Sequence, residues 1–132
     1  MSDISIYAKT KFILKMIDNI KKIIEKHGGI VKALEDELEA QPAILMALLQ
    51  IGESLNKIDK TIIEKYNLIQ EAKGAYDVRN FIAHDYESVR LEIVEDILRE
   101  SLEELEEKVL NIINVIKTSK KLEEKWRKKI LK

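Results

Sequence analysis

Residues 42–55 have the sequence PAILMALLQIGESL, and this stretch decides which fold we expect. Pro42 suits the first turn of a helix, where a missing N–H leaves no hydrogen bond unmade. The apolar residues that follow surround much of a helical circumference, which predicts the central, most buried helix of a bundle. They are Ile44, Leu45, Leu48, Leu49, Ile51 and Leu55. Gly52 lies inside this helix at a cost of about 1 kcal/mol relative to alanine, so we expect another backbone to pack closely against it.

Helical spacing of apolar residues predicts further helices on both sides of this stretch. Their expected ranges are about residues 4–26, 30–38 and 59–66, then from about residue 70 and from residue 91 onward. Gly28 and Gly29 should end the first of them, because glycine takes the left-handed conformation that closes helices. His27 is then expected to face the C-terminal end of that helix rather than to bind a ligand. Ser101 and Glu104 have the spacing of a capping box, which predicts a kink or a restart within the last helix.

These segments together predict an all-α, up-and-down bundle of about five helices with short loops. The helix that begins near residue 70 should direct four side chains toward the core, namely Tyr76, Val78, Phe81 and Ile82. We expect the bundle domain to occupy residues 1–117 and a basic helical tail to occupy residues 118–132.

The composition fits a single soluble helical domain of 132 residues, with 45% apolar and 36% charged residues. Four glycines and one proline are too few for a turn-rich β fold. The absence of cysteine excludes disulfides and thiolate metal sites. No N-terminal apolar run resembles a signal peptide, and no uncharged stretch approaches the length of a membrane span. We therefore expect a cytoplasmic protein without membrane contact.

Charge is distributed unevenly along a chain whose formal net charge is only −1. Residues 90–108 carry eight acids against three basic residues, which is a local charge of −5. Residues 117–132 carry eight Lys or Arg against two Glu, which is a local charge of +6. Two interpretations remain open at this point: both stretches are solvated helix faces, or the basic tail contacts RNA or an acidic partner.

Residues 79–86, RNFIAHDY, bring four chemically active side chains into one short segment: Arg79, Asn80, His84 and Tyr86. On a helix, Asn80 and His84 share a face, and Arg79 and Tyr86 lie nearly in register if the helix reaches Tyr86. Arg79 and His84 are five residues apart, which separates them by roughly 140° around the axis. A helix end or a partner surface would therefore have to complete a site that uses both.

The four side chains fit cleavage of RNA without a metal or another cofactor. Histidine is a common proton-transfer group in enzymes, so His84 could move a proton at the 2′-OH or at the leaving oxygen. Arg79 could hold the scissile phosphate and stabilise its developing charge. Asn80 could orient His84 or a phosphate oxygen, and Tyr86 could bind the substrate by stacking or hydrogen bonding.

A proton-transfer reaction of this kind needs both an acid and a base, while each chain offers one histidine in the segment. A twofold homodimer would bring two copies of His84 and Arg79 into one cleft. Dimerisation is therefore a mechanistic prediction of this interpretation.

Each of these residues also has a purely structural interpretation. Arg79 could pair with Glu53 or another acid, His84 could be a helix-terminal residue, Asn80 a cap and Tyr86 an aromatic residue at the edge of the core. Glu53 is placed on a helix predicted to be mostly buried, and a buried carboxylate needs a partner. Arg79 is one candidate, and a salt bridge elsewhere is the other.

Two motifs of the chain resemble those of a known family. Residues 79–86 look like the Arg-x4-His-x-Tyr motif of HEPN-domain proteins, specifically their HepT-like branch. Residues 49–56, LQIGESLN, are similar to the Ile-Gly-Glu-Ala helix of that branch. The sequence Glu87-Ser88-Val89, followed by Ile93-Val94, also fits. The resemblance covers roughly residues 5–117 and leaves the basic tail outside it.

The resemblance implies an α-helical HEPN-like bundle, a homodimer or higher even-numbered assembly with the motif in a shared cleft, and metal-independent RNase activity. It implies Arg79 and His84 as catalytic residues and Asn80 as their helper. HepT-like members are toxins of toxin–antitoxin pairs, and their antitoxin is a minimal nucleotidyltransferase that can silence the toxin by adding AMP to the motif tyrosine. That tyrosine corresponds to Tyr86.

Two interpretations from other functional classes stay open beside the ribonuclease toxin. One is a HEPN module that binds a nucleotide or RNA without cutting it. The other is a helical protein that serves only as the interaction partner of another chain, such as a nucleotidyltransferase.

Overall fold

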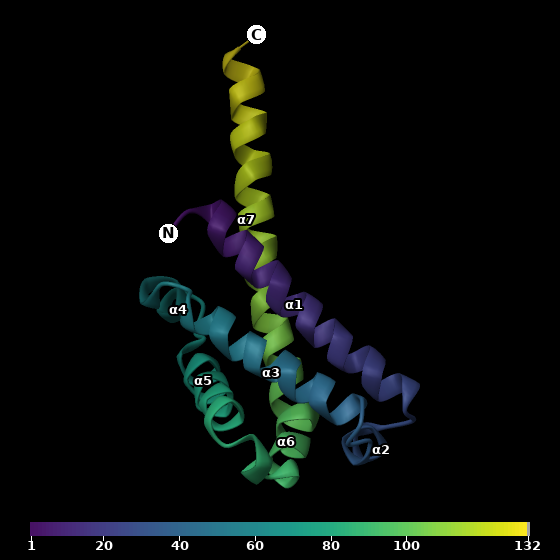
Figure 1. Ribbon diagram of the computed structural model, residues 1–132. Helices are drawn as coiled ribbons and strands as arrows, with labels where there is room; N and C mark the ends of the chain where they lie inside the picture. The colour runs from purple at the N-terminus through teal and green to yellow at the C-terminus, as the bar shows by residue number, and fades with distance from the viewer. Residues whose placement is uncertain (132) are drawn as a thin grey trace.

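The apolar segment around Leu48 forms α3 (Ala40–Asn56), which lies between α1 (Asp3–Lys26) and α5 (Ile69–His84) (Figure 1). The computed structural model describes residues 1–131, and no strand occurs among them. Eight residues of α3 are buried, because most of its circumference is covered by neighbouring helices. The all-α prediction and the central position of this helix are both confirmed.

Shorter elements connect and extend these three helices. They are α2 (Ile30–Glu35), α4 (Lys60–Lys65), a 3₁₀ turn η1 (Tyr86–Ser88), α6 (Leu91–Asp96), a π-helical turn η2 (Ile97–Ser101) and α7 (Leu102–Ile130). The segments α6, η2 and α7 run on as one long rod, against which α1 packs (Figure 1). Counting that rod once gives six helices in residues 1–131, close to the expected five.

The first helix ends where the glycines predict. His27 is the C-terminal cap of α1, and Gly28 and Gly29 have φ angles of 81° and 140°. The backbone N–H groups of both glycines donate to carbonyls of the last turn of α1, which satisfies groups that the helix end would otherwise leave unpaired. The chain therefore turns sharply into α2.

The core consists of aliphatic side chains at helical spacing in α1, α3 and α7. In α1 these include Ile13, Ile17 and Ile20, each fully buried. All six residues of the predicted stripe in α7 are buried: Leu102, Leu105, Val109, Ile112, Ile113 and Ile116. Burial of one such side chain contributes about 1.5–3 kcal/mol, so this shared core holds the helices in place.

Two expectations for the second half of the chain are wrong in part. Of the four α5 side chains expected in the core, only Ile82 is buried, and Phe81 is 54% exposed. The helix is irregular near Ser101, as expected, but the Ser101 side chain makes no capping hydrogen bond. The helix instead continues through the π-helical turn Ile97–Ser101, where one extra residue shifts the helix faces.

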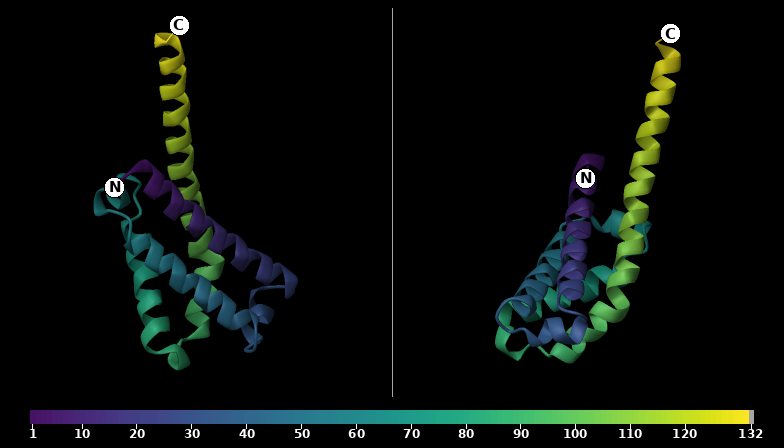
Figure 2. Two further views of the ribbon diagram at one scale, coloured as in Figure 1. Left: turned by 45° about the horizontal axis from the view of Figure 1, so that its top comes forward. Right: turned by 90° about the vertical axis from the view of Figure 1, so that its right-hand side faces the viewer.

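The last part of α7 extends beyond the bundle (Figure 2). Ile116 is the last buried residue of the described chain, and every residue from Lys117 to Leu131 is exposed. None of the helices in residues 1–131 combines the length and apolar character that crossing a bilayer would require.

Candidate functional site

Gly52 allows α3 and α5 to approach each other closely. A Cβ atom added at Gly52 would lie 2.4 Å from the carbonyl oxygen of Ala75 and 2.7 Å from the Cβ atom of Arg79. Any side chain there would push the two helices apart, since such distances are far shorter than van der Waals contact. The packing expected at this glycine is confirmed, and it places Arg79 opposite Glu53, the next residue of α3.

Arg79 is held by neighbours on three sides. Its Nη2 and Nε atoms donate to Oε1 of Glu53 at 3.1 and 3.3 Å, and Nη1 donates to Oδ1 of Asn80 at 3.0 Å. The guanidinium carbon lies 5.9 Å from the ring centroid of Tyr76, within the range of a cation–π contact. The Arg79 side chain is 27% exposed, so it is anchored but still reachable from solvent.

The observed contacts show which partners Glu53 and Asn80 have among those that the sequence left open. The ion pair of Glu53 is made with Arg79, and the Glu53 side chain is 40% exposed rather than buried. The Asn80 side chain accepts a hydrogen bond from Arg79, not from His84. Both residues thus act on the orientation of the guanidinium. Tyr76 was missed as a site residue, although its spacing of three residues from Arg79 on one helix is the signal that could have found it.

His84 is the last residue of α5 and is exposed. Its ring makes no hydrogen bond or ion pair with any other residue of the described chain. The helix ends there because Asp85 leaves the helical conformation, with φ −150° and ψ 55°. The imidazole therefore stands at the open end of α5 without a protein group to fix its orientation.

Tyr86 lies beyond the end of the helix. It begins the turn η1 and is 47% exposed. Because α5 does not reach it, the alignment with Arg79 that a longer helix would produce does not occur. Tyr86 is instead presented at the tip between α5 and α6, close in sequence to His84.

One chain does not direct Arg79 and His84 to a common point. They are separated by about 7.5 Å along the α5 axis and roughly 140° around it. The short carboxylate and amide contacts of Arg79 keep it beside α3. A substrate or a second protein surface would have to bridge the two side chains, as the spacing in the sequence predicts.

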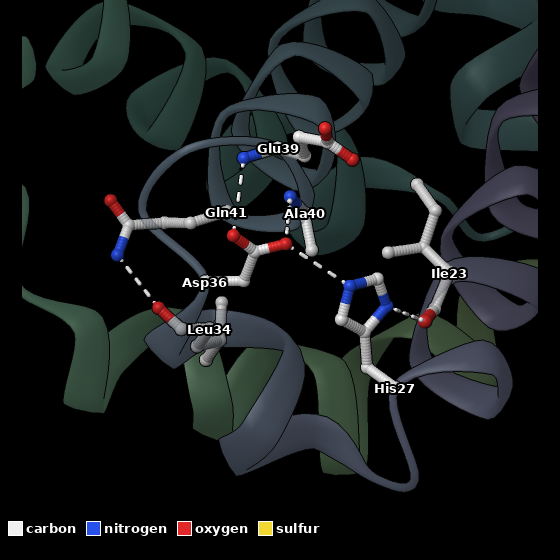
Figure 3. A network of polar contacts seen from close by, with 7 residues as sticks. All are labelled: Ile23, His27, Leu34, Asp36, Glu39, Ala40 and Gln41. Carbon is white, nitrogen blue, oxygen red and sulfur yellow. Dashed lines mark hydrogen bonds and ion pairs between the residues drawn. The ribbon is translucent and has the colours of Figure 1, made fainter.

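The second histidine belongs to a structural network at the other end of α3 (Figure 3). His27 Nδ1 lies 2.8 Å from the Ile23 carbonyl oxygen, and Nε2 lies 3.1 Å from Oδ2 of Asp36. Asp36 in turn accepts hydrogen bonds from the backbone N–H groups of Glu39 and Ala40, at the start of α3. His27 thus joins the end of α1 to the start of α3, in agreement with its prediction as a helix-terminal residue.

Within residues 1–131 no group of three or more His, Asp or Glu side chains is arranged to hold a metal ion. Two polar clusters lie on α5: Arg79 with Glu53 and Asn80, and Glu71 with Lys108.

Comparison with protein families gives one match. A family model described as HepT-like, Ribonuclease HepT-like, matches residues 13–112, which is more than half of the chain. The matched segment contains all of α3 and α5 together with Arg79, His84 and Tyr86, and it ends before the exposed part of α7. Neither the curated proteins nor the solved structures include a significant match.

Proposed function

Because the chain belongs to the HepT-like ribonuclease family, we propose that it is a cytoplasmic endoribonuclease toxin that cleaves RNA with Arg79 and His84. The observation that carries this proposal is the pairing of an anchored cation with an unengaged imidazole on one helix. Arg79 is fixed by Glu53, Asn80 and Tyr76, while His84 keeps both ring nitrogens available.

Each side chain has a distinct part in the proposed reaction. An arginine held in position stabilises the negative charge that develops on the phosphate, without spending energy on reorganisation. The His84 ring takes the proton of the 2′-OH or delivers a proton to the leaving oxygen. Cleavage by this route needs no bound metal ion, since the attacking oxygen belongs to the RNA itself.

We further propose that two chains share one cleft. Each chain contributes one imidazole at the end of α5, whereas the reaction needs an acid and a base at the same time. A twofold arrangement that brings the ends of two α5 helices together supplies both, and it also places Arg79 of one chain within reach of a phosphate bound at the partner's His84. Tyr86 at the adjacent turn would then contact the RNA.

The direct test removes each proposed catalytic group. We expect Arg79→Ala and His84→Ala each to slow RNA cleavage by purified protein at least 100-fold, in keeping with the usual contributions of charge stabilisation and proton transfer. Arg99→Ala is the matched control, because Arg99 is exposed and, within residues 1–131, its ion pair is with Glu95 on its own rod. Its rate should equal that of the wild type.

Thermal unfolding followed by circular dichroism must show that all three variants remain folded. Cleavage by His84→Ala at the wild-type rate, after removal of contaminating nucleases, would refute the catalytic assignment.

The proposed partner of the toxin is a minimal nucleotidyltransferase antitoxin that modifies Tyr86 with AMP. The exposure of Tyr86 at the turn after His84 supports this, since an enzyme can reach its hydroxyl without unfolding α5. Co-expression with such a nucleotidyltransferase should raise the intact mass of the wild type by whole AMP units, and Tyr86→Phe should stay unmodified. Tyr66→Phe, which leaves Tyr86 in place, should be modified like the wild type.

A second candidate function is RNA or nucleotide binding without cleavage. It is favoured by the lack of any contact that would orient the His84 ring within the described chain. Retention of labelled RNA by clean protein, with neither cleavage nor a dependence on His84, would select this function over the first.

A further inference from the structure

A groove of about 330 Å³ separates α5 from the rod of α6, η2 and α7, because α5 packs chiefly on α3. Beside it, where α5 gives way to α6 (Figure 1), lies a second hollow of about 200 Å³, which we call the slot. One wall of the slot carries Phe81 of α5, which is 54% exposed, and the other carries Ile93 of α6, which is 49% exposed. Exposed apolar side chains that gather at one hollow mark a contact surface, whereas scattered ones are ordinary.

The slot also has charged residues in its lining. Asp77 and Arg90 lie beside its apolar side chains, and both residues are exposed. The Arg90 side chain is 70% exposed, and its contact with Glu92 is long, with 3.9 Å between Nε of Arg90 and Oε2 of Glu92. A loose ion pair between exposed side chains contributes little, so the guanidinium remains available to another anion. The slot therefore combines an aromatic side chain, a cation and a carboxylate acceptor.

The slot lies within one helical turn of the proposed catalytic histidine. Phe81 precedes His84 by three residues on α5, which places the two about 60° apart around the helix axis and about 4.5 Å apart along it. Residues at this spacing are neighbours on the surface of a helix. Arg90 comes four residues after Tyr86, just beyond the turn η1. A group bound in the slot therefore lies beside the bond on which His84 is proposed to act.

The size and chemistry of the slot suit a single nucleobase. Its volume of about 200 Å³ is below the roughly 300–1,000 Å³ of pockets that enclose drug-sized ligands, so it suits one flat ring system. Unstacked bases of single-stranded RNA bind against aromatic side chains, and hydrogen bonds to their edges add specificity. Phe81 supplies the aromatic face, and Asp77 supplies an acceptor for an N–H group of the base edge.

A second copy of the chain is the other occupant that an exposed apolar surface can have. A standard interface buries roughly 800 Å² on each partner, whereas a whole aromatic side chain offers about 150–250 Å². Phe81 and Ile93, each about half exposed, therefore supply only a small part of such an interface. Charged residues are also depleted at interface cores, and the slot contains two. These properties favour a base over a second chain.

We propose that the slot binds the base of the nucleotide next to the scissile phosphate. This inference rests on the proposed ribonuclease function, and it names unpaired RNA as the substrate class. The base lies against the ring of Phe81, with Ile93 on its other side, while Arg90 donates to the neighbouring phosphate. A base that is stacked and paired within a duplex cannot enter the slot, so double-stranded RNA binds more weakly.

Binding is tested on the full-length His84→Ala protein, so that the RNA stays intact. The probe is a short single-stranded RNA with 2-aminopurine in place of one base. We expect its fluorescence to be quenched on binding, and Phe81→Ala in this background to weaken binding about 5- to 150-fold, the range found for loss of one base–aromatic contact. Phe81→Trp should retain the affinity, because it keeps an aromatic face. Phe12→Ala is the matched control, since Phe12 is the other phenylalanine, is 37% exposed and lies on α1.

The same RNA annealed to its complement, and the mass of each protein from sedimentation equilibrium, complete the test. The duplex should bind more weakly than the single strand, and Phe81→Ala should have the same assembled mass as its parent. The proposal fails if the probe is not quenched, if Phe81→Ala binds as tightly as Phe12→Ala, or if the duplex binds as well as the single strand. A lower assembled mass of Phe81→Ala would instead identify the slot as a contact between copies. Since every protein here lacks His84, failure of the ribonuclease assignment is read separately, from cleavage by the wild type.

Discussion

At the scale of single residues, the two proposed catalytic side chains differ in how firmly the chain holds them. Arg79 has a carboxylate, an amide and an aromatic ring as neighbours, so its charge is fixed before any substrate binds. His84 has none of these and must be oriented by the substrate or by a second chain. This difference suits a site in which Arg79 binds the phosphate first and His84 takes its active orientation only when the substrate or a second chain contacts it.

Asp36 is the residue whose ionisation has the clearest structural cause. The backbone N–H of Ala40, and then those of Glu39 and the ring of His27, hold the pKa of this carboxyl below its usual value of 3.8. Because the folded-state pKa is the lower one, the stabilisation is fully present above about pH 4 and is lost as the pH falls through the folded pKa. We expect Asp36→Asn to lower the free energy of unfolding at pH 7, with a difference from wild type that shrinks on acidification below pH 4.

Urea unfolding followed by circular dichroism at a series of pH values measures that difference. Glu37→Gln provides the comparison, since Glu37 is an exposed carboxylate in the same turn and accepts no hydrogen bond there. A destabilisation by Asp36→Asn that grows as the pH falls would contradict the proposed role of this carboxylate.

At the scale of the helices, Gly52 and Gly74 form a matched pair of substitutions. Gly52→Ala places a methyl group 2.4 Å from a carbonyl oxygen of α5, and overpacking of this kind costs about 1–3 kcal/mol. Beyond its chain neighbours and the backbone of its own helix, the methyl group of Gly74→Ala meets no heavy atom within 4 Å, so this change should stabilise α5 by about 0.5–1 kcal/mol through the better helix propensity of alanine. The same Gly→Ala change is therefore expected to lower the free energy of unfolding at Gly52 in α3 and to raise it at Gly74 in α5.

Thermal or chemical unfolding of the two variants measures each change in stability relative to the wild type. Gly52→Ala should also weaken RNA cleavage, because a shift of α5 separates Arg79 from Glu53. An unchanged or increased stability of Gly52→Ala would show that α3 and α5 can separate freely at this contact.

The helices also show which structural features could be predicted from the sequence and which could not. The buried stripe from Leu102 to Ile116 and the glycines after His27 act locally, so their pattern alone predicted the structure. The close contact at Gly52 was predictable because glycine destabilises the interior of a helix, a cost that close backbone packing can offset. Phe81 was misplaced because periodicity shows which residues are apolar, but not that α5 would leave a gap beside the rod. The capping-box spacing at Ser101 predicted an irregularity in the last helix but not its π-helical form, and no pattern in the sequence predicted that α5 ends at His84.

At the scale of the whole molecule, two surfaces of the single chain carry groups without a partner in residues 1–131. The end of α5 presents one imidazole where the proposed chemistry uses two, and the rod presents an uncovered groove and an uncovered tail. The formal net charge of −1 is the sum of an acidic segment, residues 90–108, and a basic segment, residues 117–132, which follow each other along one rod. The proposed shared cleft uses the first of these surfaces, the end of α5.

The shared cleft predicts how activity should respond when wild-type and inactive chains are mixed. In co-expressed wild type and His84→Ala at equal amounts, random pairing leaves about a quarter of the clefts with two imidazoles and about half with one. If acid and base come from different chains, RNA cleavage should fall to about a quarter of that of an all-wild-type sample at the same total protein, because mixed clefts lack one proton-transfer group. If each chain acts alone, half of the activity should remain. Differently tagged chains, purified by both tags in sequence, isolate the mixed assemblies, and cleavage by them at half the wild-type rate would show that a single His84 suffices.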